Sequence, residues 1–130
     1  MAEARVARFG NFMEEVYGFA QAVRRGGAVY VSGQTAMADD GSVAGPGDMA
    51  VQMRQAYLGI GRALEQVGAA FSDVVEETLF VTDVMAAATV AAEVRREFYG
   101  PDFPVASTLV EVRALGSPEL MIEIKCTAQM

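Results

Sequence analysis

The feature that most constrains the fold is the segment 103–126, FPVASTLVEVRALGSPELMIEIKC, which has the pattern of two β-strands and a turn. Val, Ile and Leu predominate in two runs, and we expect strands over 106–113 and 120–127. Between them lie Gly116, Ser117 and Pro118, and Gly and Pro mark turns for steric reasons. The sequence therefore predicts a β-hairpin that closes the domain.

The alternation of side chains along a strand divides each run between two faces. In the second run, one face combines Met121, Glu123 and Lys125, and the other is apolar. The apolar face comprises Leu120, Ile122, Ile124 and Cys126. The first run gives Val110 and Val112 on the core face and Ser107, Leu109, Glu111 and Arg113 on the opposite face. We therefore expect one core face and one mixed face, which suits a partly buried pocket or a contact between subunits.

Histidine is absent from the chain, and cysteine occurs once, at Cys126. Ser-His-Asp and Cys-His nucleophile systems are excluded, as are His-ligated metals and thiolate clusters, because they need these side chains. Any chemistry has to rest on carboxylates, hydroxyls, backbone amides or arginine. We expect Cys126 to be a small side chain in the core, and a single cysteine agrees with a reducing compartment.

Length and charge limit the class of protein further. A chain of 130 residues predicts one domain, 1–130. The net charge of −7 argues against nucleic-acid binding, because contacts with phosphate dominate that affinity. The sequence has no run of about 18 apolar residues and no secretory signal at its start, so we expect a cytoplasmic protein without a membrane span.

Upstream of the closing segment, the sequence predicts two strands, a helix, a third strand and a second helix. Strands at 19–24 and 28–32 flank a turn with Gly26 and Gly27. A helix with apolar residues at three- and four-residue spacing begins after Asp48 and ends at Gly68. A strand over 72–84 and a helix over 86–99 follow, and residues 1–15 form an irregular arm or a first strand. The order is β-β-α-β-α-β-β, an α+β fold.

Two details of these elements bear on packing and chemistry. Gly59 and Gly61 each weaken the first helix by up to about 1 kcal/mol relative to Ala, so we expect them to allow close packing on a sheet. Glu76 and Glu77 are adjacent in the third strand and point to opposite faces. We expect them near a rim, and they do not form an acid–base pair.

Six segments between about Gly18 and Thr127 have a specific order and spacing: 19–23 (FAQAV), 29–34 (VYVSGQ), 73–75 (DVV), 81–83 (VTD), 110–112 (VEV) and 122–124 (IEI). Together they resemble the RidA (YjgF) superfamily. The resemblance implies a chorismate-mutase-like fold with two helices on one face of the sheet. It also implies a homotrimer, in which the sheets form a central barrel and pockets lie between subunits. Well-studied members hydrolyse reactive imines and enamines to keto acids and ammonia, without a metal or organic cofactor.

The chain departs from the deaminating members, in which an arginine early in the penultimate strand binds the substrate carboxylate. Alignment on 110–112 places that position at Ser107, and alignment on 103–104 places it at Ala106. We prefer Ser107, because alternation places it on the mixed face. Neither residue can replace a bidentate guanidinium. The family's pocket tyrosine corresponds to Phe19, and an asparagine corresponds to Met85, so we expect a more apolar pocket.

The glutamate of the family's site is retained at Glu123, and the resemblance implies that it orients or activates the hydrolytic water. An apolar cleft would raise the pKa of Glu123 toward neutrality, which suits a general acid–base. The alternative is a charge at the subunit interface, paired with an arginine such as Arg113. The other expected pocket residues are Phe19, Ser32, Gly33, Met85, Ser107 and Thr108. For Ser32 and Gly33, the alternative is that they only shape the end of a strand.

Two hypotheses on function follow. The first is a cytosolic homotrimer that binds a small metabolite between subunits and hydrolyses an imine, enamine or related C–N bond with Glu123 and water. Without the arginine it is not an efficient 2-imino-acid deaminase. The second is a non-catalytic ligand-binding or regulatory trimer. A third, RNA cleavage, follows only from labels given to some family members, and the net charge argues against it.

Overall fold

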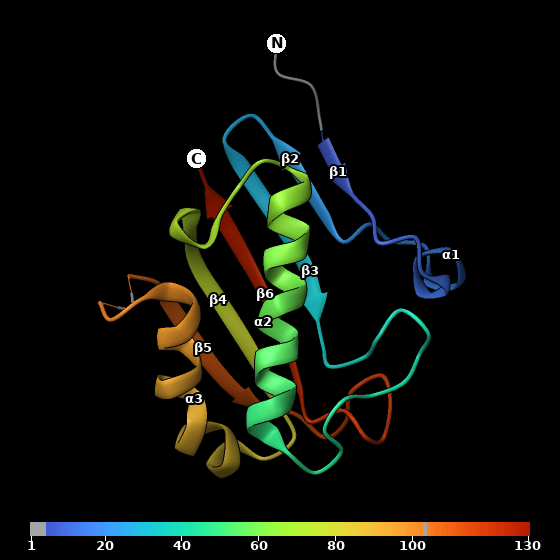
Figure 1. Cartoon of the computed structure of the whole chain (residues 1–130), viewed down its shortest axis with the longest axis vertical. Coiled ribbons are helices and arrows are strands. Elements are labelled where there is room, and N and C mark those ends of the chain that lie inside the picture. The colour runs from blue at the N-terminus through green and yellow to red at the C-terminus, as the bar shows by residue number, and fades with distance from the viewer. Residues whose placement is uncertain (1–4, 103) are drawn as a thin grey trace.

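The structure is a computed structural model that describes residues 5–102 and 104–130. The start of the expected N-terminal arm and Phe103 lie outside the described residues. A six-stranded mixed sheet carries two long helices on one face (Figure 1). The strands are β1 (Arg5–Ala7), β2 (Ala22–Arg25), β3 (Ala28–Gln34), β4 (Val74–Val81), β5 (Ala106–Glu111) and β6 (Ile122–Gln129). The helices are α1 (Phe12–Tyr17), α2 (Met49–Gln66) and α3 (Val84–Tyr99), with a short 3₁₀ turn η1 (Phe71–Asp73).

The predicted order β-β-α-β-α-β-β is confirmed for the main body of the chain, with β1 and α1 added before it. Residues 1–15 thus contain the first strand, one of the two alternatives, whereas α1 was not expected. β1 pairs antiparallel with β2, and β2 forms the predicted hairpin with β3. Gly26 adopts a φ of +58° in that turn, a conformation that glycine takes without strain.

Helix α2 begins and closes where its sequence signals predict. The side chain of Asp48 accepts a hydrogen bond from the Val51 amide, and Gly68 after the helix has a φ of +77°. A Cβ on Gly59 would lie 2.7 Å from Oε1 of Gln34, so this glycine does bring α2 close to β3. Gly61 instead faces the ring of Phe71 in η1.

The core lies between the sheet and the two long helices, α2 and α3 (Figure 1). Its largest fully buried apolar side chains are Tyr57, Met53, Ile60 and Leu64 from α2 and Val29, Leu79, Val81, Ile122 and Ile124 from the sheet. The apolar parity of the last strand is confirmed, because Leu120, Ile122, Ile124 and Cys126 are all buried. No helix within the described ranges is both long and apolar enough to cross a membrane.

The predicted closing hairpin is wrong. The sheet order is β1-β2-β3-β6-β4-β5, so β6 inserts between β3 and β4, while β5 forms the edge and pairs parallel with β4. A parallel pair needs a crossover, and α3 supplies it between β4 and β5. The segment between β5 and β6 therefore passes the C-terminal end of β4, which lies between the two strands, and is not a hairpin turn. Strand β5 also ends at Glu111, two residues earlier than expected.

The edge position of β5 reverses the predicted parity of its side chains. The register with β4 places Ser107 beside Glu77, and the Ser107 hydroxyl donates to the Glu77 carboxylate at 2.6 Å on the helix-covered face. Val110, expected in the core, lies on the opposite face and is 37% exposed. The side chains of β5 do alternate between the two faces, but the pairing of β5 with β4 determines which side chains lie on which face.

Glu77 is the most unusual charged residue of the fold. Glu76 and Glu77 do point to opposite faces, as predicted, but Glu77 is not at a rim: its side chain is fully buried. Its Oε1 accepts hydrogen bonds from the hydroxyls of Tyr57 at 2.8 Å and Tyr99 at 2.7 Å. Its Oε2 accepts from Ser107 and forms an ion pair with Arg95 at 2.9 Å. The cluster ties α2, α3, β4 and β5 together.

Candidate functional site

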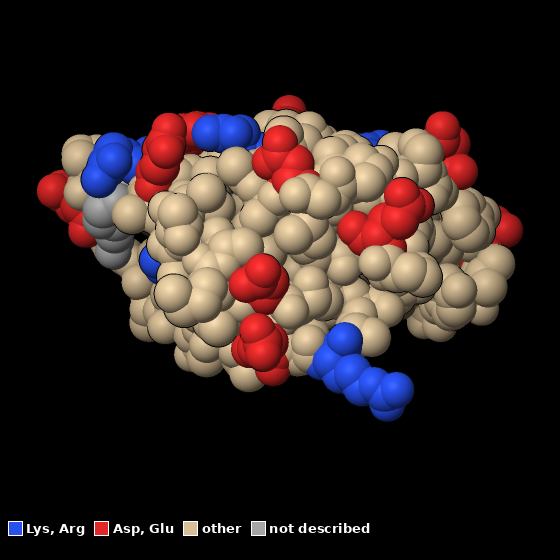
Figure 2. Space-filling model, turned by 90° about the horizontal axis from the view of Figure 1, so that it is seen from below, with Lys and Arg blue, Asp and Glu red and all other residues tan. Residues whose placement is uncertain are grey.

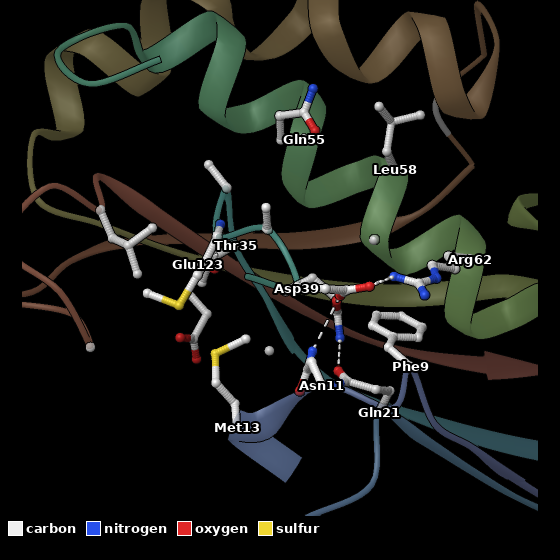
Figure 3. A pocket seen from close by; sticks show the side chains of 18 of the residues that line it. Phe9, Asn11, Met13, Gln21, Thr35, Asp39, Gln55, Leu58, Arg62 and Glu123 are labelled. Atoms are coloured by element: carbon white, nitrogen blue, oxygen red, sulfur yellow. Dashed lines mark hydrogen bonds and ion pairs between the residues drawn. The ribbon is translucent and has the colours of Figure 1, made fainter. Parts of the chain in front are cut away.

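A cavity of about 540 Å³ lies where β3 ends, beside β6 (Figure 3). Its walls come from α1, from the segment after β3, from one side of α2 and from the segment between β5 and β6. The lining includes Phe9, Asn11, Phe12, Met13, Tyr17, Phe19, Gln21, Gly33, Gln34, Met37, Asp39, Leu58, Arg62 and Glu123. The cavity therefore collects residues from distant parts of the chain around the carboxylate of β6.

Glu123 reaches the cavity because of its strand parity and because of a glycine beside it. In β6 it lies opposite Phe80 of β4, on the face that the helices leave open. The pairing of β3 with β6 shifts register between Val31 and Gln34, and Gly33 lies in that irregularity. A Cβ on Gly33 would overlap the Glu123 carboxylate and lie 2.6 Å from its Cδ. Only glycine at position 33 leaves enough space for the Glu123 carboxylate.

The surroundings of Glu123 favour the protonated form of its carboxyl group more than water does. Burial raises the pKa of Glu123 above its ordinary value, because desolvation disfavours the charged form. Within the described residues, Glu123 forms no ion pair and no side-chain hydrogen bond. The alternative interpretation, an ion pair with Arg113, is therefore not present in the single chain.

A chain of buried amide groups supports the wall next to Glu123. Gln34 donates to the Oε1 of Gln21 at 2.8 Å, and Gln21 donates to the Glu14 carboxylate at 2.8 Å. Glu14 also accepts from the amides of Phe9 and Gly10. Burial opposes ionisation of Glu14, but these donors outweigh it and lower its pKa. Short helix α1 is thereby fixed to β2 and β3.

The other end of the cavity contains an ion pair between two lining residues, Arg62 and Asp39. Arg62 of α2 binds Asp39 through Nη1, at 3.2 and 3.1 Å from the two carboxylate oxygens. Its guanidinium also lies 3.9 Å from the centre of the Phe9 ring. Asn11 donates weakly to Asp39 at 3.4 Å. Figure 3 shows Arg62 and Asp39 pointing toward one another, apart from Glu123.

The structure brings together three of the predicted site residues, Phe19, Gly33 and Glu123, around this cavity. Ser32 is adjacent, but its hydroxyl donates to the Ala20 carbonyl at 2.6 Å and fixes the strand end. Met85 lies in the first turn of α3 and is 73% exposed.

The two predicted residues of β5 do not line the cavity of a single chain. Ser107 binds Glu77 beneath the helices, and Thr108 lies opposite Thr78 on the other face. The prediction that Ser107 lies on the same face as the site residues, which favoured it as the arginine position, is therefore wrong. Ala106 shares the open face with Glu123, so geometry now favours Ala106 for that position. Neither Ala106 nor Ser107 carries a guanidinium group.

Sequence reasoning missed most of the apolar wall. Phe12, Met13 and Tyr17 belong to α1, a six-residue helix that is too short to show a hydrophobic period. Met37 lies in an irregular segment, and Leu58 is a helix residue on the side away from the core, 54% exposed. One signal was available: Asn11 followed three residues later by Glu14 is the pattern of a capped helix start, and the Asn11 side chain does accept from the Glu14 amide.

Comparison with known proteins agrees with this architecture. The family model described as Endoribonuclease L-PSP matches residues 11–130. A cattle protein named 2-iminobutanoate/2-iminopropanoate deaminase is 32% identical over 97 residues, which cover 75% of this chain and 69% of that protein. A RutC family protein of Pyrococcus abyssi is 30% identical over 110 residues, covering 85% of this chain and 84% of the relative.

Solved structures give the same result at the level of the fold. A Mycobacterium tuberculosis protein of the YjgF/YER057c/UK114 family is 36% identical, with a TM-score of 0.85 over 98% of this chain and 100% of the other. A Rid family protein of unknown function from Yersinia pestis is 26% identical, with a TM-score of 0.84 over 98% and 100% of the two chains. By sequence and by α+β fold, the chain belongs to the RidA (YjgF) superfamily.

Proposed function

We propose that the chain forms a homotrimer that binds a small metabolite in pockets between subunits and hydrolyses an imine, enamine or related C–N bond with Glu123 and water. The observation that carries the proposal is the Glu123 carboxyl group itself. It is partly buried in a cavity, its pKa is raised by burial, and no cation of the described chain neutralises it. Such a group suits proton transfer better than structural ion pairing.

The chemistry needs one group that takes a proton and returns it. The Glu123 carboxylate accepts a proton from water as the water oxygen attacks the imine carbon, and the C=N electron pair moves to nitrogen. The protonated Glu123 then returns the proton to the nitrogen of the resulting carbinolamine. Glu123 next takes the proton of the carbinolamine hydroxyl and delivers it to the amino group. The C–N bond then breaks, ammonia leaves and the hydroxyl oxygen becomes the carbonyl oxygen of the product. Protons balance over the cycle, so one carboxyl group suffices.

The trimer is supported by the composition of the open sheet face. Val6, Tyr30 and Val110 point away from the helices and are 47%, 56% and 37% exposed. A sheet face of this kind requires a cover, and association of identical chains supplies one. Equilibrium sedimentation at micromolar concentration tests this: the proposal expects a trimer, and a stable monomer contradicts it.

The proposal excludes efficient hydrolysis of 2-imino acids. The cattle relative is named for that activity, but this chain has Ala106 and Ser107 where an arginine would bind the substrate carboxylate. Phe19 and Met85 are further apolar replacements. Met85 and Thr108 remain proposed pocket residues, contributed across the subunit interface. The proposed activity uses no metal or organic cofactor.

The same replacements favour a second candidate, a trimer that binds a small ligand without catalysis. RNA cleavage is disfavoured despite the description of the matching family model, because the chain carries a net charge of −7. Figure 2 shows one face on which acidic side chains lie among uncharged ones, while basic side chains lie toward its edges. The single, buried Cys126 supports a reducing, cytoplasmic location.

The test is release of ammonia from freshly generated 2-iminopropionate and from larger apolar imines, by wild type and Glu123→Gln. The proposal expects faster release from at least one apolar imine by wild type, and loss of that rate in Glu123→Gln. Glu119→Gln is the matched control, because it removes an exposed carboxylate four residues away that does not line the cavity. Catalysis that persists in Glu123→Gln refutes the mechanism. Ligand binding without turnover favours the second candidate.

A further inference from the structure

The cavity at Glu123 is larger and more apolar than a small 2-imino acid requires. Its volume of about 540 Å³ falls within the range of roughly 300–1,000 Å³ typical of sites for larger organic ligands. The uncharged wall includes the polar side chains of Asn11, Gln21, Gln34, Thr35 and Gln55, but apolar and aromatic residues outnumber them. The larger apolar and aromatic side chains include Phe12, Met13, Tyr17, Phe19, Met37 and Leu58. Figure 3 shows Met13 on α1 and Leu58 on α2 among the side chains that line the cavity together with Glu123.

The charged residues that line the cavity disfavour an anionic ligand. Of the residues that line the cavity in the described chain, Arg62 is the one cation. It already binds Asp39 and lies over the Phe9 ring. Glu123 then remains as an uncompensated carboxylate. A second carboxylate on a bound ligand would be repelled by Glu123 and would lose water without gaining a cation.

From these two observations we propose that the cavity selects an uncharged imine or enamine that carries an aromatic or branched aliphatic group. The apolar group occupies the wall formed by α1, Met37 and Leu58, and the C–N bond lies beside Glu123. A ligand with a carboxylate at the reacting carbon is disfavoured. This inference rests on the proposed function, and it adds the class of substrate.

Binding of product-like ketones tests the inference without turnover. Benzylacetone and benzylpyruvate share the phenylethyl ketone group, and they differ because a carboxylate replaces a methyl group. The chain has eight methionines, so 13C-labelled methionine methyl groups serve as reporters by NMR. Met13 and Met37 line the cavity, whereas Met130 follows β6 at the end far from Glu123, is 45% exposed and serves as the internal control. Single Met→Leu substitutions assign the three signals.

We expect benzylacetone to shift the signals of Met13 and Met37 in a saturable manner and to leave the signal of Met130 unchanged. Benzylpyruvate should bind about tenfold more weakly, the factor that corresponds to roughly 1.4 kcal/mol of unfavourable charge interaction. Glu123→Gln should narrow this difference, because the repelling charge is removed.

Benzylpyruvate binding as tightly as benzylacetone, or more tightly, overturns the inference, as does the absence of shifts at Met13 and Met37 with both ligands. Failure of the proposed function has a different signature. In that case benzylacetone still binds selectively, while no apolar imine is hydrolysed faster by wild type than by Glu123→Gln.

Discussion

The buried ion pair between Arg95 and Glu77 gives a prediction whose magnitude follows from the structure. Arg95→Met removes the cation and keeps much of the side-chain volume. Glu77, with a fully buried side chain, would keep its three hydroxyl donors but lose its counter-charge. Removing one partner of a buried pair costs roughly 3–5 kcal/mol. Arg95 Nε is buried without a hydrogen-bond partner in the described chain, which offsets part of that cost. We therefore expect a loss of about 3 kcal/mol.

The matched control is Arg54→Met. Arg54 donates three hydrogen bonds to Glu97, with better geometry than Arg95, but the two side chains are 37% and 43% exposed. An exposed pair contributes about 1 kcal/mol or less. If hydrogen-bond geometry alone set the loss of stability, Arg54→Met would cost more than Arg95→Met, whereas burial predicts the reverse.

Equilibrium unfolding in urea, followed by circular dichroism at one fixed protein concentration, measures both losses. A loss of about 3 kcal/mol is a large part of the roughly 5–15 kcal/mol that folded domains have. If Arg95→Met costs no more than Arg54→Met, the reasoning that burial makes the Glu77 cluster essential is wrong.

Three further predictions concern the cavity and its supports. Burial raises the folded-state pKa of Glu123, so ionising Glu123 lowers the stability of the wild type as pH rises through that pKa. Glu123→Gln should therefore be more stable than wild type at pH 7, and this difference should vanish below about pH 4. If the two proteins were equally stable at pH 7 as well, the prediction would be wrong. Gly33→Ala should displace the Glu123 carboxylate with a loss of less than about 1 kcal/mol, because the overlapping atoms end a flexible side chain; an unchanged NMR titration of Glu123 would argue against displacement. Gly59→Ala should cost about 1–3 kcal/mol in urea unfolding, because Gln34 is held by Gln21 and cannot move aside; a neutral effect would show that α2 can shift.

Much of the fold could be predicted because its signals are local. The cap at Asp48, the turn at Gly26 and the alternation in β6 each depend on neighbouring residues, and each is found in the structure. The partner of β5 could not be predicted in this way. Two strands separated by Gly and Pro suggest a hairpin, but β6 pairs with β3 and β4. That choice depends on long-range packing of α2 and α3, which no local pattern encodes.

The site could be predicted in part for the same reason. Glu123 was predicted from strand parity together with the family resemblance, and Gly33 from the resemblance alone; both line the cavity. Ser107 was misplaced because its parity was counted from the wrong neighbour. The apolar wall of Met13, Met37 and Leu58 comes from a short helix, an irregular segment and an exposed helix side. None of these shows a periodic signal in the sequence.

The role of Glu123 as the reacting group is tested by the pH dependence of imine hydrolysis in wild type and Glu123→Gln. We expect the wild-type rate to rise with pH through the raised pKa of Glu123, as the carboxylate becomes able to accept a proton from water. Glu123→Gln should be slow and show no such rise, while Glu119→Gln keeps the wild-type profile. An identical pH profile in wild type and Glu123→Gln would contradict the assignment of Glu123 as the reacting group.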